Sequence, residues 1–206
     1  MASSVSISSW ASGFVIPKNT TLYSSIGGRL AKYDTEVQIE SPVRDAGVFK
    51  NLFAYVPTNT TTVTTVITLR KSTAATALTV SYTSGQTGIK EDTTNTPSFA
   101  NTDKVDWQIA VPNEAPASNF TLSILGVEFV PTTTTNCITF FRTAVNQSTA
   151  SNSVTVYSPP NGITTFTTIE ANNKYRIRAA CTARDFYVYV NANARTTDCV
   201  FGTRKN

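Results

Sequence analysis

The chain has 206 residues and a net charge of +4, with 15% charged residues and 36 threonines. This length is enough for one larger β domain or two small ones, and the many β-branched residues favour a β-sandwich. Histidine is absent, which argues against Ser-His-Asp catalysis and against histidine-ligated metals. The basic residues are scattered rather than gathered in a patch, so we expect no binding of nucleic acid.

Residues 1–20 are a serine-rich N-terminal segment that we interpret as a candidate attachment strand. A short apolar run at residues 14–16 ends at Pro17, and Trp10 stands alone among small polar residues. We expect Trp10 and Phe14 to contact a partner chain. The segment has no basic start and no continuous apolar core, unlike a signal peptide, and no run of the chain is long enough to span a membrane.

Residues 21–131 are predicted to form a jelly-roll-like antiparallel β-sandwich. Segments in which apolar and polar residues alternate, at residues 36–40, 77–83 and 103–111, recur between glycine and proline turns. Residues 120–130 form a more apolar strand. The side chains expected inside are those of Val37, Ile39, Leu78, Val80, Tyr82, Val105, Trp107, Ile109 and Val111.

Residues 49–72 are predicted to form two further strands joined by a Thr/Asn turn. We expect Phe53, Tyr55, Val63 and Leu69 to point inward, because they occupy alternating apolar positions.

The same stretch has a second copy at the end of the chain, because residues 183–206 match residues 49–72 without a gap. The offset is 134, and continuing it backwards maps residues 3–72 onto 137–206. The identical pairs in the first match are Tyr55/Tyr189, Val56/Val190, Asn59/Asn193, Thr62/Thr196, Val66/Val200, Arg70/Arg204 and Lys71/Lys205. We therefore predict a Thr-rich linker at 132–136 and a second, incomplete β-repeat at 137–206.

The second repeat has no counterpart of residues 73–136, which leaves two alternatives. The sequence is a fragment of a longer polypeptide, or a neighbouring subunit completes the half-repeat by donating strands to its open edges. The basic pair Arg204 and Lys205 lies at this end, and we expect it to contact a partner.

The polar residues match no template for catalysis, so we predict no enzyme, no cofactor and no bound metal. The acidic loop at 91–95, together with Asp103 and Asp106, has oxygen ligands of the kind that calcium prefers. It lacks the spacing of a calcium-binding loop, and a solvated turn is the preferred interpretation. The remaining carboxylates on or beside strands are those of Glu36, Glu40 and Glu128. No two of them have a spacing that indicates an acid/base couple.

The three cysteines, Cys137, Cys181 and Cys199, lie in the last third of the chain without a CxxC spacing. This pattern gives no zinc site. Buried free thiols are the preferred interpretation, and a pairing of Cys181 with Cys199 is the alternative.

The segment TSGQTGIKEDTTNTPSFANTDKVDWQIAV, residues 83–111, resembles the middle of C1q/TNF-like jelly rolls and of related β-sandwiches in phage virion proteins. A glycine turn and a short acidic loop precede a hydrophobic strand, with Thr102-Asp103 where such folds often have Gly-Asp. The similarity extends over about residues 49–130. It implies a homotrimeric jelly roll, with a dimer as the alternative, of the type found in capsid decoration proteins, cement proteins and head fibres.

The sequence therefore leaves two alternative functions. The first is a non-enzymatic virion structural protein, made in a host cytoplasm, that binds the major capsid protein or other virion subunits and stabilises the particle. The second is a carbohydrate-binding or adhesin-type β-sandwich module of a surface or tail-fibre protein, for which exposed aromatic side chains would stack on a glycan.

Overall fold

The computed structural model describes residues 4–30, 32–113, 119–133, 190, 196 and 198–202. The chain divides into two compact units, residues 1–175 and 176–206, and each is considered by itself. All the strands described here lie in the first unit. The predicted second repeat lies outside the described residues, apart from a few positions near its end.

The described part of the first unit consists of short and long strands with one turn of 3-10 helix. In chain order the elements are β1 (Val5–Pro17), β2 (Thr20–Ser24), β3 (Gly28–Arg29), the 3-10 helix η1 (Glu36–Gln38), β4 (Ser41–Pro42), β5 (Gly47–Val56), β6 (Thr58–Asn59), β7 (Thr65–Lys71), β8 (Ala74–Tyr82), β9 (Gly88–Asp92), β10 (Ser98–Phe99), β11 (Lys104–Val111) and β12 (Asn119–Pro131).

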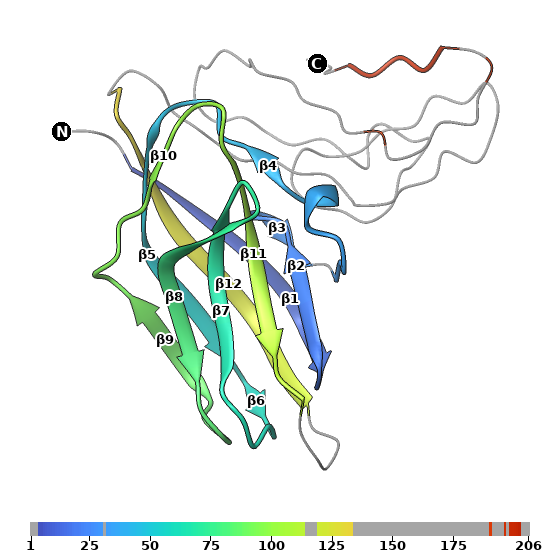
Figure 1. Cartoon of the computed structure of the whole chain (residues 1–206), viewed down its shortest axis with the longest axis vertical. Helices are drawn as coiled ribbons and strands as arrows, with labels where there is room; N and C mark the ends of the chain where they lie inside the picture. Colours follow the sequence, from blue (N-terminus) through green and yellow to red (C-terminus); the bar gives the residue numbers. More distant parts are fainter. Residues whose placement is uncertain are drawn as a thin grey trace. The chain divides into compact units, whose positions relative to one another are not determined.

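The strands form two sheets that pack face to face (Figure 1). Sheet A has the order β10-β5-β12-β1-β3, with β9 also paired to β5 and β6 to β12. Sheet B has the order β2-β11-β7-β8, with β4 also paired to β11. Apart from a two-residue parallel pairing of β1 with β3, the pairings between these strands are antiparallel. The predicted all-β antiparallel sandwich is thereby confirmed.

One continuous hydrophobic core fills the space between the sheets. The predicted inward rows of β8 and β11 are confirmed, with Tyr82 and Trp107 among the largest fully buried side chains. The Tyr82 hydroxyl donates across the core to the backbone oxygen of Ala54 in sheet A, at 2.9 Å. Since a buried hydroxyl without a partner is costly, this bond ties the two sheets at a defined place. Burial is also the main reason why the pKa of Tyr82 rises to about 12.

The inward face of β5 differs from the prediction, and a β-bulge is the reason. Phe49 points into the core as alternation requires, but Asn51 has a positive φ of 54° and the register with β12 shifts there. The extra residue reverses the alternation, so that Leu52 is fully buried. Phe53 is consequently only half-buried and Tyr55 is exposed. The prediction that both point inward is wrong.

The stretch 49–72 connects the two sheets instead of forming one hairpin. Strand β5 belongs to sheet A and β7 to sheet B, and the Thr/Asn segment between them crosses from one to the other. Asn59 holds this crossing: its Nδ2 donates to the backbone oxygens of Thr83 and Gln86, both at 3.0 Å. Two more residues of this stretch were predicted to point inward. Leu69 is buried, and Val63 is half-buried.

The predicted strand at residues 36–40 is instead the 3-10 turn η1, closed by the Ile39 backbone N–H donating to the Glu36 oxygen at 3.0 Å. Ile39 is buried as expected, but Val37 is 50% exposed. Two glutamates of this segment have cationic partners on neighbouring strands of sheet B, Glu36 with Arg70 of β7 and Glu40 with Lys104 of β11.

The N-terminal segment contributes a long strand, β1, which lies between β12 and the short strand β3 in sheet A. Strand β1 begins at Val5, well before the predicted run at 14–16, and pairs with β12 from Val5 to Pro17. The predicted end at Pro17 is confirmed.

Candidate functional site

The residues predicted to contact a partner have different places in the structure. Phe14 is 8% exposed and packs into the core, so it is not available on the surface of the single chain. Trp10 lies in β1, where its backbone pairs with Ile124 on one side and Arg29 on the other; its side chain is outside the described set. Arg204 and Lys205 lie outside the described residues.

An exposed row of apolar side chains crosses sheet A next to Trp10. Ile89 in β9 is directly opposite Tyr55 in β5, and Tyr55 is directly opposite Ile124 in β12. The exposed fractions are 61% for Ile89 and 37% for each of the other two. We call these three residues the apolar row. In the backbone register, the next position beyond Ile124 is Trp10 in β1.

The apolar row exists because two strands depart from regular alternation. The bulge at Asn51 turns Tyr55 outward, as described above. In β12 the buried positions change phase between Leu122 and Leu125, which leaves Ile124 outside. The partner strand β1 shows a register shift at the same level, between Trp10 and Phe14. Exposed apolar side chains that are aligned on adjacent strands are typical of an interaction surface.

A polar group lies further along β5 and β12 of sheet A, where Glu128 is four residues beyond Ile124. Glu128 accepts a hydrogen bond from Asn51 Nδ2 at 2.6 Å and lies 3.6 Å from Lys50 Nζ. Hydrogen bonding by Ser4 is the main reason why the pKa of Glu128 lies below its usual range, with Asn51 and Lys50 adding to it against the effect of burial. The sheet therefore has a charged, hydrogen-bonded group at some distance from the apolar row, separated from it by the pair Gly126 and Phe53.

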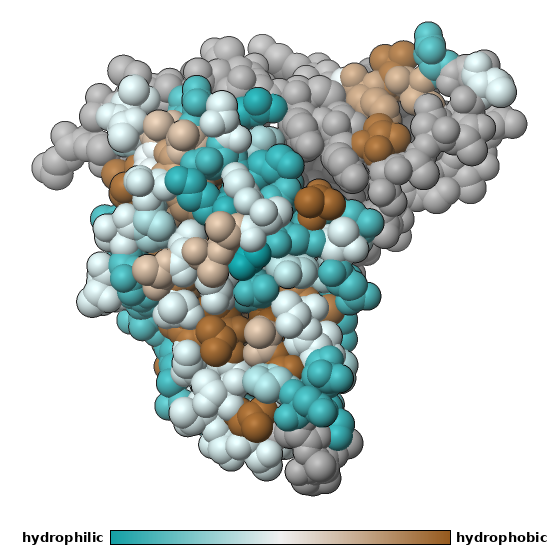
Figure 2. All heavy atoms as spheres, in the orientation of Figure 1, coloured by the Kyte–Doolittle hydropathy of each residue, from teal (hydrophilic) through white to brown (hydrophobic). Residues whose placement is uncertain are grey.

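The face of the sandwich that carries β7, β8 and β11 looks different. Figure 2 shows that white and teal residues predominate there and that hydrophobic residues occur in small separate groups. This agrees with the outward positions of β8, which include Thr79 and Ser81.

The acidic loop at 91–95 is a hydrogen-bonded turn, as expected, but Asp92 within it is buried and not solvated. Asp92 Oδ1 accepts from the backbone N–H groups of Thr94 and Asn95, both at 3.1 Å, and from Thr94 Oγ1 at 3.0 Å. Its Oδ2 accepts from Asn95 Nδ2 at 2.8 Å and from the Thr79 backbone N–H in sheet B at 3.1 Å. Burial raises the pKa of Asp92, but these hydrogen bonds outweigh it and lower the pKa to about 2.

The other two acidic residues considered with this loop lie in different environments. Asp103 accepts from the Ala100 backbone N–H and is 3.1 Å from Lys71 Nζ. Asp106 is fully buried on β11 and belongs to a separate cluster.

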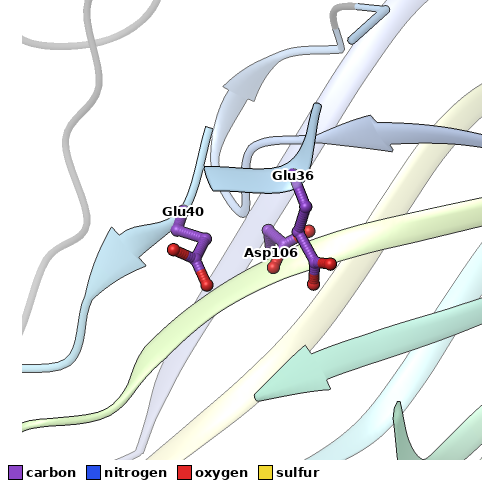
Figure 3. Close-up of side chains that lie close together, drawn as sticks. All are labelled: Glu36, Glu40 and Asp106. Atoms are coloured by element: carbon purple, nitrogen blue, oxygen red, sulfur yellow. The ribbon is translucent and has the colours of Figure 1, made fainter. Parts of the chain in front are cut away.

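That cluster contains three carboxylates on the side of sheet B where η1 lies (Figure 3). Glu36 begins η1, Glu40 precedes β4, and Asp106 lies near the start of β11. One oxygen atom of each lies within 4.8 Å of the others. The pairing of Ser41 with Val105 brings the end of the η1 segment beside Asp106. We call these three residues the carboxylate cluster.

Two cationic side chains pair with the carboxylate cluster. Arg70 Nε and Nη2 donate to the two oxygens of Glu36 at 2.8 Å and 3.0 Å, a bidentate arrangement. Lys104 Nζ donates to Glu40 Oε2 at 2.9 Å. The hydrogen bonds to Glu36 are the main reason why the pKa of Arg70 is raised above its already high value. Arg70 is also directly opposite Asp106 on the adjacent strand.

The carboxylate cluster was not predicted from the sequence, although its three residues were each considered there separately. Asp106 interrupts the apolar strand at an outward position, where a charge is normally solvated. Glu36 and Glu40 are four residues apart, which on a straight strand places them on one face but does not direct them to β11. Only the 3-10 turn and the pairing of β4 with β11 bring the three together.

Two further expectations can be compared with the described residues. Cys199 is exposed, so the expectation of a buried thiol is wrong for this cysteine; Cys137 and Cys181 lie outside the described residues. Within the part of the chain that the structure describes, no helix has the length and apolar character needed to cross a membrane.

Comparison with protein-family models, with curated proteins and with solved structures found no match to this chain.

Proposed function

We propose that this chain is a non-enzymatic virion structural protein of the capsid decoration, cement or head-fibre type, which binds capsid subunits through the apolar row. The observation that carries the proposal is the alignment of Ile89, Tyr55 and Ile124 across three adjacent strands. Burying such a row against another protein removes apolar surface from water, which favours association.

The fold component of the proposal is a jelly roll, and the strand pairings support it. The first long strand pairs with the last, β1 with β12, and the second with the one before the last, β2 with β11. Inside these, β5 pairs with β9 and β7 with β8. Four nested antiparallel pairs divided between two sheets are expected when a long hairpin is rolled into a jelly roll. Capsid and lectin domains both use this architecture, so the site must decide between functions.

The oligomer and the repeat are parts of the same proposal. A homotrimer, with a dimer as the alternative, would present several copies of the apolar row to a symmetric particle. The incomplete repeat at 137–206, including Arg204 and Lys205, would supply a further contact between subunits.

A carbohydrate-binding or adhesin-type module is the second candidate, and one observation favours it. Tyr55 is an exposed aromatic residue on sheet A, and the backbone of Trp10 lies two strands away in the same register. An exposed aromatic ring such as that of Tyr55 can stack on a sugar ring.

The test uses purified protein and particles of the virus that encodes it, prepared without this chain. The double variant Tyr55→Ser with Ile124→Ser should lose co-sedimentation with the particles. Val37→Ser, which removes a comparably exposed apolar side chain from η1, should retain it. Light scattering should give a trimer or dimer for the unchanged chain.

Three results would count against the proposal. Equal co-sedimentation of both variants would exclude the apolar row as the docking surface. Absence of particle binding by the unchanged chain would remove the virion assignment. A monomer that binds a glycan array, and loses that binding in Tyr55→Ser, would establish the second candidate instead.

A further inference from the structure

We propose that the carboxylate cluster is a calcium-binding site. The inference goes beyond the proposed function, because it concerns η1, β4 and β11, and not the apolar row. It also departs from the sequence-based expectation that the chain binds no metal. The ligands would be oxygens of Glu36, Glu40 and Asp106, which come from three separate parts of the chain.

The geometry suits a cation of the size of calcium. Calcium binds oxygen ligands at 2.3–2.6 Å, so two ligands of one ion lie up to about 5 Å apart. The three carboxylates each have an oxygen within 4.8 Å of the others. Magnesium, at 2.0–2.1 Å, requires a tighter arrangement of roughly 4 Å across.

The environment of Glu40 also indicates a bound cation. Its side chain is only 2% exposed. Lys104 donates to Oε2, whereas no side chain or backbone group among the described residues donates a hydrogen bond to Oε1. Burying a carboxylate oxygen without a donor is unfavourable, unless a cation or a water molecule satisfies it. Glu40 Oε1 is therefore the atom for which a ligand is most needed.

The charges also balance when calcium is bound. Three carboxylates and the two cations Arg70 and Lys104 leave one formal negative charge, since −3 + 2 = −1. The Lys104 side chain is 48% exposed, so its ammonium can move into water when a divalent ion enters. With calcium bound and Lys104 displaced, the three carboxylates, the calcium ion and Arg70 have a net formal charge of zero, since −3 + 2 + 1 = 0. Arg70, at 12% side-chain exposure and bidentate to Glu36, would remain and orient that carboxylate.

Calcium and the Lys104 ammonium would compete for Glu40, and a substitution of Lys104 tests this competition. Replacing Lys104 by glutamine removes the ammonium that occupies Glu40, so calcium affinity should increase by roughly two- to fivefold, the range expected for an exposed ion pair. An ion-pair network without a calcium site predicts no calcium binding in this variant.

The experiment is a calorimetric titration of the purified chain, treated with chelator beforehand, with calcium chloride. We expect a dissociation constant on the order of 10⁻⁴ M, as in weak extracellular calcium sites. Calcium at 10 mM should then raise Tm by roughly 5 °C. Magnesium at equal concentration should have a smaller effect.

Matched variants separate the calcium site from general binding to acidic residues. Asp106→Asn and Glu40→Gln should lose both the heat of binding and the rise in Tm. Glu91→Gln, which removes an exposed carboxylate on β9, should behave as the unchanged chain. Absence of calcium binding in both the unchanged chain and Lys104→Gln would overturn the inference, as would unaltered binding in Asp106→Asn.

Discussion

Replacing Asp92 by asparagine is expected to destabilise the sandwich, because this carboxylate joins the two sheets. Asp92 ends β9 in sheet A and accepts five hydrogen bonds, one of them from the Thr79 backbone N–H in sheet B. An asparagine has one amide NH₂ in place of an accepting oxygen. In either orientation, that group would face donors that now bind Asp92.

The size of the effect follows from the pKa of Asp92, which is lowered from 3.8 to about 2. A difference of this size corresponds to about 2 kcal/mol of stability at neutral pH. Because the folded pKa lies below the ordinary value, the folded chain binds fewer protons than the unfolded chain in this range. The contribution is therefore fully present above about pH 4 and is lost as the pH falls through about 2.

The assay is urea unfolding monitored by the fluorescence of Trp107, which is 1% exposed in the folded protein. Asp92→Asn should lower the free energy of unfolding at pH 7 by about 2 kcal/mol and reduce the loss of stability between pH 4 and 2. The neighbouring variant Glu91→Gln is the control. If Asp92→Asn matched this control at pH 7 and kept the full acid dependence, the assignment of Asp92 as an inter-sheet acceptor would be refuted.

Two further variants test the packing between the sheets. Tyr82→Phe should cost about 1–2 kcal/mol, because the hydroxyl loses its one donated hydrogen bond, for which the Ala54 oxygen at 2.9 Å and the Gly88 oxygen at 3.1 Å are the acceptors. Because the pKa of Tyr82 is raised to about 12, the hydroxyl keeps its proton in the folded chain at pH values where the unfolded chain has lost it. The unchanged chain should therefore lose stability between pH 10 and 12. A Tyr82→Phe variant with the same loss would contradict the assignment of this pH dependence to Tyr82. Gly47→Ala should cost about 1–3 kcal/mol in urea unfolding, because its Cβ would lie 2.5 Å from both Phe129 Cζ and the Val130 oxygen. In the control Gly126→Ala the nearest such contact is 3.6 Å, and equal losses in the two would show that Gly47 is not specially confined.

The apolar row and the carboxylate cluster can be studied independently, because they consist of different strands. The row belongs to β9, β5 and β12 of sheet A, and the cluster to β11 and the segment around η1 and β4. A variant that abolishes calcium binding should therefore leave particle binding unaffected, provided that its Tm without calcium is unchanged.

Local patterns in the sequence were sufficient to predict an all-β antiparallel sandwich and the inward rows of β8 and β11. On these strands the inward apolar side chains recur at every second position, and a period of two then decides which side chains face the core. The turn at Asp92 was likewise a local matter, since most of its hydrogen bonds reach no further than three residues along the chain. In each case the determining interactions lie close together in sequence.

The two candidate sites were decided by tertiary structure. The bulge at Asn51 reverses the faces of β5, and its position depends on pairing with β12, which is far away in the chain. Tyr55 was therefore expected in the core and instead lies at the centre of the apolar row. Likewise Asp106 meets Glu36 and Glu40 only because β4 pairs with β11. A sequence pattern describes the alternation within a strand, but register and bulges depend on the neighbouring strands. Register and bulges determine where the apolar row and the carboxylate cluster lie.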